Sequence, residues 1–158
     1  MAHPHAALIE KFYQAFQRRD GEAMAACYGP AVRFSDPVFP NLEGERAKDM
    51  WRMLCLRAED LRVEFSNVSA DDAHGSAHWE AHYSFSRTKR KVHNIIDAHF
   101  HFHNGLISEH IDSFGFWRWS RQALGLPGVL LGWTPLIQGA VRKQAAAGLD
   151  AFAQQKQK

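Results

Sequence analysis

An Asn104-Gly105 pair lies between two stretches of alternating apolar and polar residues, 92–103 and 106–119. Both central residues of a type I′ turn need a positive φ angle, and Asn-Gly is the pair that adopts it most readily. The pair therefore predicts a two-residue β-hairpin. Further strand-like stretches precede it at 61–68 and 75–87, so we expect antiparallel strands throughout the second half of the chain.

The register of this hairpin brings carboxylates and imidazoles together. With Asn-Gly as the two turn residues, Asp97 faces Asp112 and His99 faces His110, with opposed Cβ atoms about 5 Å apart. Like charges in such positions destabilise a sheet. A facing pair of aspartates therefore needs either compensation or a functional purpose.

A second two-residue turn at 89–90 would extend this polar face to the preceding strand. Its register places His82 beside Asp97 and Glu80 beside His99. The opposite face has the composition of a surface packed on helices or on another subunit, with Trp79, Tyr83, Ile96, Phe100, Phe102, Ile107 and Ile111. The residues expected on the polar face are Glu80, His82, Ile95, Asp97, His99, His110, Asp112 and Phe114.

Two alternatives to a functional polar face stay open. In an average sheet the polar side chains point to water and the aromatic face forms the core. A β-bulge in one of these long strands would also exchange the two faces beyond it, and the alternation does not locate one.

The residues before the sheet are mostly helical. Apolar residues recur at helical spacing over 8–16, Asp20 can cap a short second helix, and a third helix at 47–58 contains Trp51. A short strand at 32–35 separates the second helix from the third. Helices at one end and strands at the other imply an α+β fold, with helices covering one face of a long, bent antiparallel sheet.

Length and composition fit one domain, 1–158, in which 120–158 is a C-terminal extension packing on the rest. Its last helix should begin at Thr134-Pro135. The N-terminus lacks the pattern of a secretory signal, so we expect a cytoplasmic protein. The longest apolar stretch, 128–141, is too short to cross a bilayer and indicates packing surface, so no membrane partner is expected.

Cysteine and charge content argue against a disulfide-bonded protein and against a nucleic-acid-binding protein. Cys27 and Cys55 lack C-x-x-C spacing and are expected to be free thiols. The net charge is only +2, and the basic cluster 87–91 lies between two strands with no interleaved aromatic residues. We therefore expect a solvated turn there and no nucleic-acid partner.

Two segments carry a family resemblance, FYQAFQRRDGEAMAACYGPAVRFSDP at 12–37 and NIIDAHFHFHNGLISEHIDSFGFW at 94–117. Their order and spacing resemble the nuclear transport factor 2-like superfamily, and within it the ketosteroid isomerases and the SnoaL-like, polyketide cyclase-like proteins. The resemblance covers about the first 120 residues. It implies a cone-shaped curved antiparallel sheet closed by three N-terminal helices around an apolar pocket, with an extra C-terminal helix here, and a homodimer formed through the sheet.

The resemblance to the isomerases also implies roles for individual residues. Asp36, in the Asp-Pro pair that ends the first strand, corresponds to the aspartate that shuttles the substrate proton. Asp97 corresponds to an aspartate that its apolar surroundings keep protonated, so that it donates a hydrogen bond to the oxyanion. Tyr28 resembles a supporting tyrosine. Phe12 stands where the isomerases have their principal oxyanion tyrosine, and it cannot donate a hydrogen bond.

Asp112 also resembles an aspartate of the superfamily's epoxide hydrolases. Those enzymes pair it with an Arg-x-Asp on a neighbouring strand, which reads Glu80-Ala81-His82 here. The epoxide-opening triad therefore lacks its arginine.

The first functional hypothesis is cofactor-free proton transfer on a small apolar molecule, by an isomerase, cyclase or hydrolase of the ketosteroid isomerase type. Asp36 or Asp112 would take a proton while a neutral Asp97 or a histidine such as His110 donates one, because two carboxylates in a poorly hydrated pocket retain a proton near neutral pH. The expected lining of the pocket is Phe12, Trp51, Glu80, His82, Ile95, His99 and Phe114.

Two other functions are kept as alternatives. The same fold can serve as a non-catalytic ligand-binding or dimerisation module, which a pocket filled by Trp51, Phe12 or the C-terminal segment would favour. A metal site on the histidine-rich strand is the third, with His99-x-His101 as ligands and Asp97 and His110 nearby.

Overall fold

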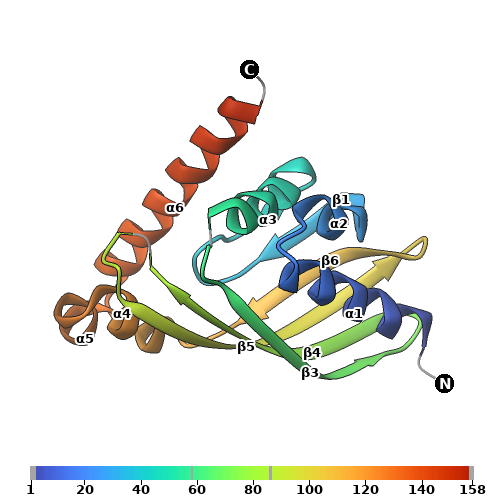
Figure 1. Ribbon diagram of the computed structural model, residues 1–158, viewed down its shortest axis with the longest axis horizontal. Helices are drawn as coiled ribbons and strands as arrows, with labels where there is room; N and C mark the ends of the chain where they lie inside the picture. Colours follow the sequence, from blue (N-terminus) through green and yellow to red (C-terminus); the bar gives the residue numbers. More distant parts are fainter. Residues whose placement is uncertain (1–2, 58, 86, 157–158) are drawn as a thin grey trace.

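The computed structural model describes residues 3–57, 59–85 and 87–156 (Figure 1). Helices and strands segregate as expected of an α+β fold, and α1, α2 and α3 lie on one side of a curved sheet. No helix in these described ranges is long and apolar enough to cross a membrane. The elements are α1 Pro4–Gln17, α2 Gly21–Ala26, β1 Tyr28–Ser35, β2 Leu42–Glu43, α3 Glu45–Arg57, β3 Arg62–Ala70, β4 His74–Ser84, β5 Lys91–His103, β6 Leu106–Ser113, α4 Phe116–Leu124, α5 Leu126–Leu131 and α6 Pro135–Lys156.

The described strands form one six-stranded sheet in the order β2-β1-β6-β5-β4-β3. All neighbours are antiparallel except β1 and β6, which run parallel. The expectation of a wholly antiparallel sheet is therefore wrong for that one pair. The exception follows from topology, because β1 lies between its sequence neighbour β2, to which it is antiparallel, and the distant strand β6, to which it is parallel.

Local sequence accounts for the first two helices. Pro4 lies in the first turn of α1, where its missing N–H costs nothing. The buried face of α1 includes Phe12 and Tyr13, both fully inaccessible. Asp20 caps α2 as predicted, its Oδ1 accepting a hydrogen bond of 3.0 Å from the backbone N–H of Ala23.

The Asn104-Gly105 turn forms as predicted, with φ angles of 52° and 76°. The two residue pairs next to it have the expected register, and then the register shifts at a β-bulge. Phe102 pairs with Ile107 and His101 pairs with Glu109, so Ser108 is the extra residue of β6. Because successive side chains alternate between faces, one extra residue turns the rest of β6 over.

The predicted pairing of Asp97 with Asp112, and of His99 with His110, is therefore wrong. Asp97 pairs with Ser113, and Asp112 lies beside Ala98 with its side chain on the opposite face of the sheet. The face covered by helices is called the inner face below, and the other is the outer face. Asp112 is 4% exposed on the inner face, whereas Asp97 is exposed on the outer face.

The β4–β5 turn is longer than two residues, which shifts its register relative to the prediction. The Phe85 N–H donates to the Arg90 carbonyl, and His82 pairs with His93 instead of Asp97. Glu80 likewise pairs with Ile95 and not with His99. The partner of each β4 residue moves by an even number of positions along β5. Because side chains alternate between faces, each side chain of β4 keeps the face that was predicted for it.

The core lies between the inner face of the sheet and α1 and α3. Its largest fully buried side chains include Trp51, Tyr13, Phe12, Phe34 and Phe100. Ile111, which was expected on this apolar face, is 40% exposed on the outer face because it follows the bulge. Cys27 and Cys55 are buried free thiols, as predicted.

A second, smaller cluster lies under α4 and consists of Val92, Phe116, Trp119 and Ala123. The stretch that forms α4 was predicted as the end of the last strand, but β6 stops at Ser113. Three half-buried side chains pack against both clusters, namely Val38, Tyr83 and Phe114. The C-terminal segment therefore covers one end of the cone.

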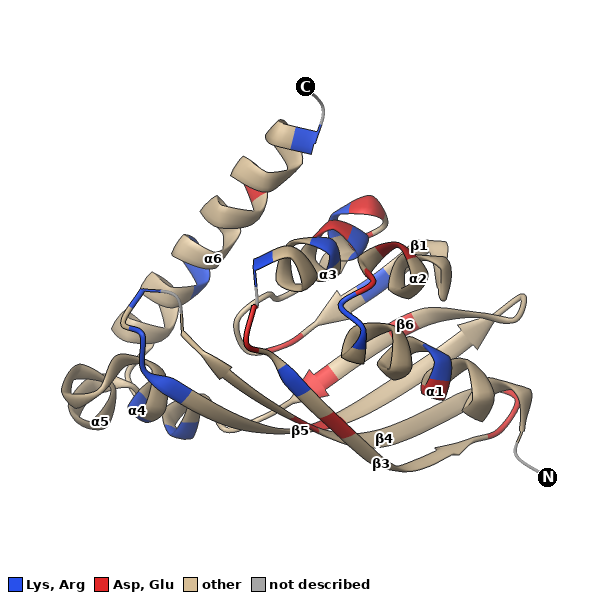
Figure 2. Cartoon of the chain, viewed as in Figure 1, with Lys and Arg blue, Asp and Glu red and all other residues tan. Residues whose placement is uncertain are grey.

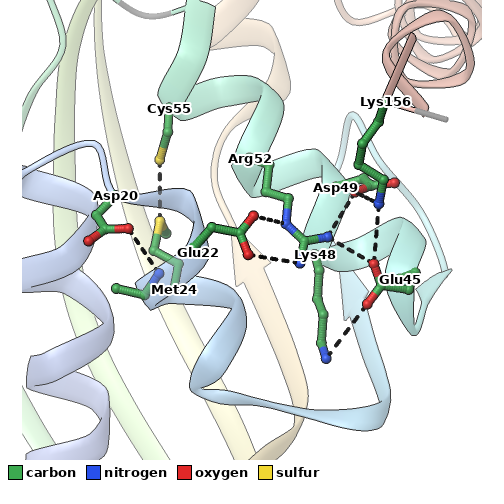
Figure 3. A network of polar contacts seen from close by, with 10 residues as sticks. Asp20, Glu22, Met24, Glu45, Lys48, Asp49, Arg52, Cys55 and Lys156 are labelled. Atoms are coloured by element: carbon green, nitrogen blue, oxygen red, sulfur yellow. Dashed lines mark hydrogen bonds and ion pairs between the residues drawn. The ribbon is translucent and has the colours of Figure 1, made fainter. Parts of the chain in front are cut away.

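A network of ion pairs fastens α6 to α3 and α2 (Figure 3). Arg52 of α3 contacts Glu22 at 2.6 Å, Glu45 at 2.8 Å and Asp49 at 2.9 Å. Lys156 in the last turn of α6 contacts Asp49 at 2.7 Å. Asp49 is buried, so it is the member of the network that most needs its two cations.

Candidate functional site

A chain of hydrogen bonds runs through the buried interior of the cone. The indole N–H of Trp51 donates to the Tyr28 hydroxyl at 2.8 Å, and that hydroxyl lies 2.7 Å from Nδ1 of His110. Nε2 of His110 lies 2.8 Å from Oδ1 of Asp112. The indole N–H of Trp79 donates to the same Asp112 oxygen at 3.3 Å.

The order of donors in this chain fixes the tautomer of His110. An indole nitrogen only donates, so the Tyr28 oxygen accepts from Trp51 and its own hydrogen is available to His110 Nδ1. Nε2 then carries the hydrogen that reaches Asp112. This arrangement leaves no donor unpaired, and its carboxylate end collects two hydrogen bonds. Burial and the charge of Asp112 raise the pKa of Tyr28 well above its usual value, so its hydroxyl stays protonated.

The β-bulge explains why these groups meet. His110 and Asp112 follow Ser108 on β6 and point inward, and Tyr28 begins β1, the parallel neighbour of β6. The ring of His110 is fully buried and stacks on Trp51, with centroids 5.9 Å apart and planes at 9°. Both ring nitrogens of this histidine are hydrogen-bonded, so that it links Tyr28 to Asp112.

Asp36 stands at the end of β1, where the sequence predicted it. Its Oδ1 accepts hydrogen bonds from the backbone N–H groups of Val38 at 2.7 Å and Phe39 at 2.6 Å. Burial, and to a smaller extent the charge of Asp112, raise the pKa of Asp36 to about 7 against the opposing effect of those two hydrogen bonds. Asp36 and Asp112 are thus electrostatically coupled, and Asp36 can hold or release a proton near neutral pH.

Tyr83 lies between Asp36 and the C-terminal segment. Its hydroxyl accepts a hydrogen bond of 2.8 Å from the indole N–H of Trp119 on α4. Burial raises the pKa of Tyr83 to about 12, and the charge of Asp36 contributes to the rise. In addition, Nε of Arg142 on α6 donates to the carbonyl of Pro37 at 2.8 Å. Both α4 and α6 therefore close over the Asp36 end of the cone.

Tyr13 is a candidate that the sequence reasoning set aside, because it lies about 100° from Phe12 around a helix. Both rings are fully buried in the structure, since the interior wraps around more than one side of α1. Within the described ranges the Tyr13 hydroxyl is buried and has no hydrogen-bond partner. Burial raises its pKa well above the usual value, and the charge of Asp112 raises it further. An unpaired buried hydroxyl is costly, and a bound oxygen atom would satisfy it.

Aromatic side chains fill the interior around these polar groups. Phe12 contacts the rings of Tyr28, Trp51 and His110 at centroid distances of 5.2 to 5.5 Å. Two surface hollows lie away from the chain of hydrogen bonds. One of about 290 Å³ is lined by Val38 and Phe39, on the loop that holds Asp36, together with Arg46, Arg142 and Lys143.

The other hollow, of about 380 Å³, lies at the outer face near the β4–β5 turn and is lined by His82, His93, Asp60 and Gln122 among others. The outer face also holds Asp97, Glu80, Ile95 and His99, which were expected in the pocket. These residues are therefore separated by the sheet from Asp36, Asp112, His110 and Tyr28. Phe12 and Trp51 are in the interior as predicted, and Phe114 is half-buried at its end.

Ion pairs link several of these outer-face residues. His78, which the sequence reasoning overlooked, contacts Asp97 at 3.0 Å and Glu80 at 3.0 Å. Glu80 also lies 2.6 Å from Nε2 of His93, whose ring stacks on His82 at a centroid distance of 4.0 Å. The carboxylates raise the pKa of His78, and the histidines lower that of Glu80.

The metal site expected at His99, His101, Asp97 and His110 does not assemble, because His110 is on the inner face and the other three are on the outer face. Another set converges on the outer face, formed by Glu80, His82 and His93. One ligand atom from each of these lies within 4.8 Å of the others. It is the only such group among the described residues.

Comparisons with known proteins agree with this fold. The SnoaL-like domain family matches residues 9–110. A Mycobacterium tuberculosis epoxide hydrolase of the LEH-like type has a similar structure (TM-score 0.62, 18% identity, covering 80% of this chain and 95% of that one). A putative polyketide cyclase from Xanthomonas campestris pv. campestris is also similar (TM-score 0.63, 19% identity, covering 75% and 96%).

A third similar structure is a hypothetical protein from Catenulispora acidiphila with a ketosteroid isomerase-like fold, in complex with trimethylamine (TM-score 0.66, 13% identity, covering 81% and 97%). No curated protein sequence matches the chain. At these identities the solved structures establish the fold alone. The match over residues 9–110 and the cone of sheet and helices show that the chain belongs to the SnoaL-like domain family, within the nuclear transport factor 2-like superfamily.

Proposed function

We propose that this protein catalyses cofactor-free proton transfer on a small apolar molecule, with Asp36 as the acid and base. The observation that carries the proposal is the half-buried carboxyl group of Asp36, which the backbone N–H groups of Val38 and Phe39 hold at the end of β1 and whose pKa is raised to about 7. A carboxyl group with a pKa near 7 both accepts and returns protons efficiently at neutral pH. The aromatic rings of the interior fit an apolar substrate.

The other polar groups of the interior have roles in this proposal. The Tyr13 hydroxyl, which has no partner among the described residues, would donate a hydrogen bond to a substrate oxygen that gains negative charge. It would replace the donor that Phe12 cannot supply. Tyr28 and His110 act as positioning residues, because their hydrogen bonds hold the Asp112 side chain in place.

Substrate access requires movement of the C-terminal segment. Phe114, Tyr83 and Val38 pack against the cluster under α4, and the Trp119–Tyr83 hydrogen bond joins α4 to β4. Rotation of α4 away from the sheet would open a path to Asp36 without disturbing the β strands. Such a lid is a common way to exclude water from an acid–base site.

A probe reaction tests the proposal without knowledge of the natural substrate. Nitrobenzisoxazole opens its ring when a base removes a carbon-bound proton, and the product is coloured. We expect wild-type protein to accelerate this reaction, Asp36→Asn to lose at least about 100-fold of the rate, and Tyr13→Phe to lose less. Asp97→Asn is the matched control, since Asp97 is on the outer face. Equal rates for wild type and Asp36→Asn would refute the role of Asp36.

A non-catalytic module is the second candidate, and the aromatic filling of the interior favours it. Phe12 and Trp51 occupy the space that a substrate would need. In this function the outer face would form a homodimer, since it exposes Ile95 and Ile111 among its histidines. Sedimentation velocity of wild type and of Ile95→Glu would test it, and a monomer at all concentrations would exclude the dimer.

Divalent metal binding is the third candidate, favoured by the convergence of Glu80, His82 and His93. Two imidazoles and one carboxylate are a common ligand set for Zn²⁺. Calorimetric titration with Zn²⁺ should show one site in wild type and none in His93→Ala. His101→Ala, which changes an exposed histidine of the same strand, should bind as wild type does. Heat changes that are the same in all three proteins would rule the site out.

A further inference from the structure

The α4–α5–α6 end of the molecule exposes more apolar surface than any packing within the chain explains. Six large side chains of one short stretch are between 43% and 76% exposed, namely Leu126, Val129, Leu130, Leu131, Trp133 and Leu136. Trp117 of α4 is 43% exposed beside them, and its indole N–H donates to the carbonyl of Val129. The sequence predicted 128–141 to be packing surface, but much of that stretch is exposed in the described part of the chain.

The charged residues of α4 and of the first half of α6 are all positive. No Asp or Glu occurs between Asp112 and Asp150, whereas this interval contains Arg118, Arg121, Arg142 and Lys143. Figure 2 shows Lys and Arg, but no Asp or Glu, on α4 and on the part of α6 nearest to α5. An apolar surface with cations on the same helices is complementary to an anionic apolar partner.

The basic turn 87–91 belongs to the same end. Arg90 Nε donates to the carbonyl of Gln122 at 2.8 Å, and the Thr88 hydroxyl donates to the carbonyl of Ala123. The guanidinium of Arg87 donates to Gln144 of α6. The turn is therefore held against α4 and α6, and it adds Lys89 and Lys91 to the cations of this end.

The two exposed tryptophans have the properties of interfacial anchors. The indole N–H of Trp133 donates to the carbonyl of Leu130 at 3.1 Å, as that of Trp117 does to Val129. Their ring surfaces are thus free to enter an apolar phase without carrying an unpaired donor with them. Arg121 lies over the Trp117 ring, 4.1 Å from its centroid, which places a cation at the level of the indole.

From these observations we propose that α5 and the adjoining ends of α4 and α6 form a docking surface for an anionic phospholipid bilayer. Leu126, Leu130 and Trp133 would enter the acyl boundary, and the arginines and lysines would contact the phosphate headgroups. α5 lies at one end of the molecule's longest axis, so it can reach a flat surface without hindrance from the sheet (Figure 1). The binding is peripheral, since none of the described helices can span a bilayer. This proposal does not depend on the acid–base function.

Co-sedimentation with vesicles tests the proposal. We expect wild-type protein to sediment with vesicles of equimolar phosphatidylcholine and phosphatidylglycerol, and to be released by raised salt. Vesicles of phosphatidylcholine alone should bind it at least about tenfold more weakly. The double variant Leu130→Glu with Trp133→Glu should lose binding to both. Leu56→Glu, which changes a leucine that is 72% exposed on α3, should bind as wild type does.

Two results would overturn the proposal. One is wild-type protein that stays in the supernatant with the anionic vesicles. The other is a Leu130→Glu, Trp133→Glu variant that sediments as wild type does while its circular dichroism and unfolding midpoint are unchanged. If wild type fails to bind vesicles but forms dimers that this variant dissociates, the surface serves a second copy of the chain and the lipid proposal is wrong.

Discussion

The hydroxyl of Tyr28 lies 2.7 Å from Nδ1 of His110, a residue 82 positions further along the chain. The contact joins the first residue of β1 to β6, its parallel neighbour. It is the middle link of a chain of hydrogen bonds that runs from the indole of Trp51, through Tyr28 and His110, to the carboxyl group of Asp112. Removal of the Tyr28 hydroxyl leaves a buried nitrogen unpaired on each side, that of Trp51 and that of His110.

Tyr28→Phe should therefore lower the free energy of unfolding by about 1–3 kcal/mol, because it leaves the Trp51 N–H and His110 Nδ1 without partners. Tyr13→Phe is the matched control: it removes a buried hydroxyl that has no hydrogen-bond partner among the described residues, and should be neutral or stabilising. Urea unfolding of the three proteins measures the difference. Equal losses from both substitutions would mean that the chain of hydrogen bonds contributes no stability.

Asp36 should make the stability of the protein depend on pH. An unfolded aspartate releases its proton near pH 4, at about its reference pKa, whereas folded Asp36 has a pKa of about 7. Between these values the folded state binds more protons, so the contribution of Asp36 to stability falls as pH rises from about 4 to about 7. This loss of stability is complete above the pKa of folded Asp36 and amounts to at most about 4 kcal/mol.

Asp36→Asn tests this sign, because asparagine keeps an oxygen for the Val38 and Phe39 N–H groups and carries no charge. The variant should match wild type near pH 4 and exceed its free energy of unfolding at pH 8. Urea unfolding at both pH values gives the comparison, and measuring the pair at the lower pH controls for changes unrelated to ionisation. A difference between the two proteins that is the same at both pH values would contradict a raised pKa.

Local patterns in the sequence predicted the parts of the fold that depend on local interactions. The Asn104-Gly105 turn, the cap at Asp20 and the start of the last helix at Pro135 each follow from the φ angles or hydrogen bonds of a few neighbouring residues. The position of Asp36 at the end of a strand follows from the proline after it.

The composition of the site could not be predicted in the same way, because it depends on one residue of the β6 register. Ser108 has no feature that distinguishes a bulge from regular pairing, and its insertion moves Asp112 and His110 to the face opposite Asp97. A signal for α4 was present, since Phe116, Trp119 and Ala123 recur at helical spacing. The alternation of apolar and polar residues before it favours a strand more strongly than this spacing favours a helix.

Deletion of Ser108 should prevent stable folding. Without the extra residue the regular register would continue, and His110 and Asp112 would turn to the outer face while Ile111 turned inward. The interior would lose the acceptor of the Tyr28 hydroxyl. We expect the deletion variant to show no cooperative unfolding transition by circular dichroism.

Ser108→Ala separates the effect of the register from that of the side chain. Ser108 is half-buried and its alanine variant keeps the number of residues in β6, so its free energy of unfolding should lie within about 0.5 kcal/mol of wild type. If the deletion variant unfolded cooperatively at the wild-type midpoint, the bulge would not determine which residues face the interior.

The ion-pair network at α3 should hold the C-terminal helix through Asp49 and not through its exposed members. The Asp49 side chain is 6% exposed and contacts both Arg52 and Lys156, whereas the Glu45 side chain is 64% exposed. Asp49→Ala removes the buried carboxylate, so that Arg52 and Lys156 share the exposed Glu45 instead, and should cost about 2–3 kcal/mol. Glu45→Ala should cost less than about 1 kcal/mol, because solvent screens an exposed pair.

Hydrogen exchange resolves where the stability is lost. In Asp49→Ala the amides of the last turns of α6, near Leu149 and Lys156, should exchange faster, while those of β5 stay protected. Leu149 is fully buried, so its burial would keep part of α6 in place. Faster exchange of the same size in Glu45→Ala would mean that charge at the surface, and not the buried carboxylate, fastens α6 to α3.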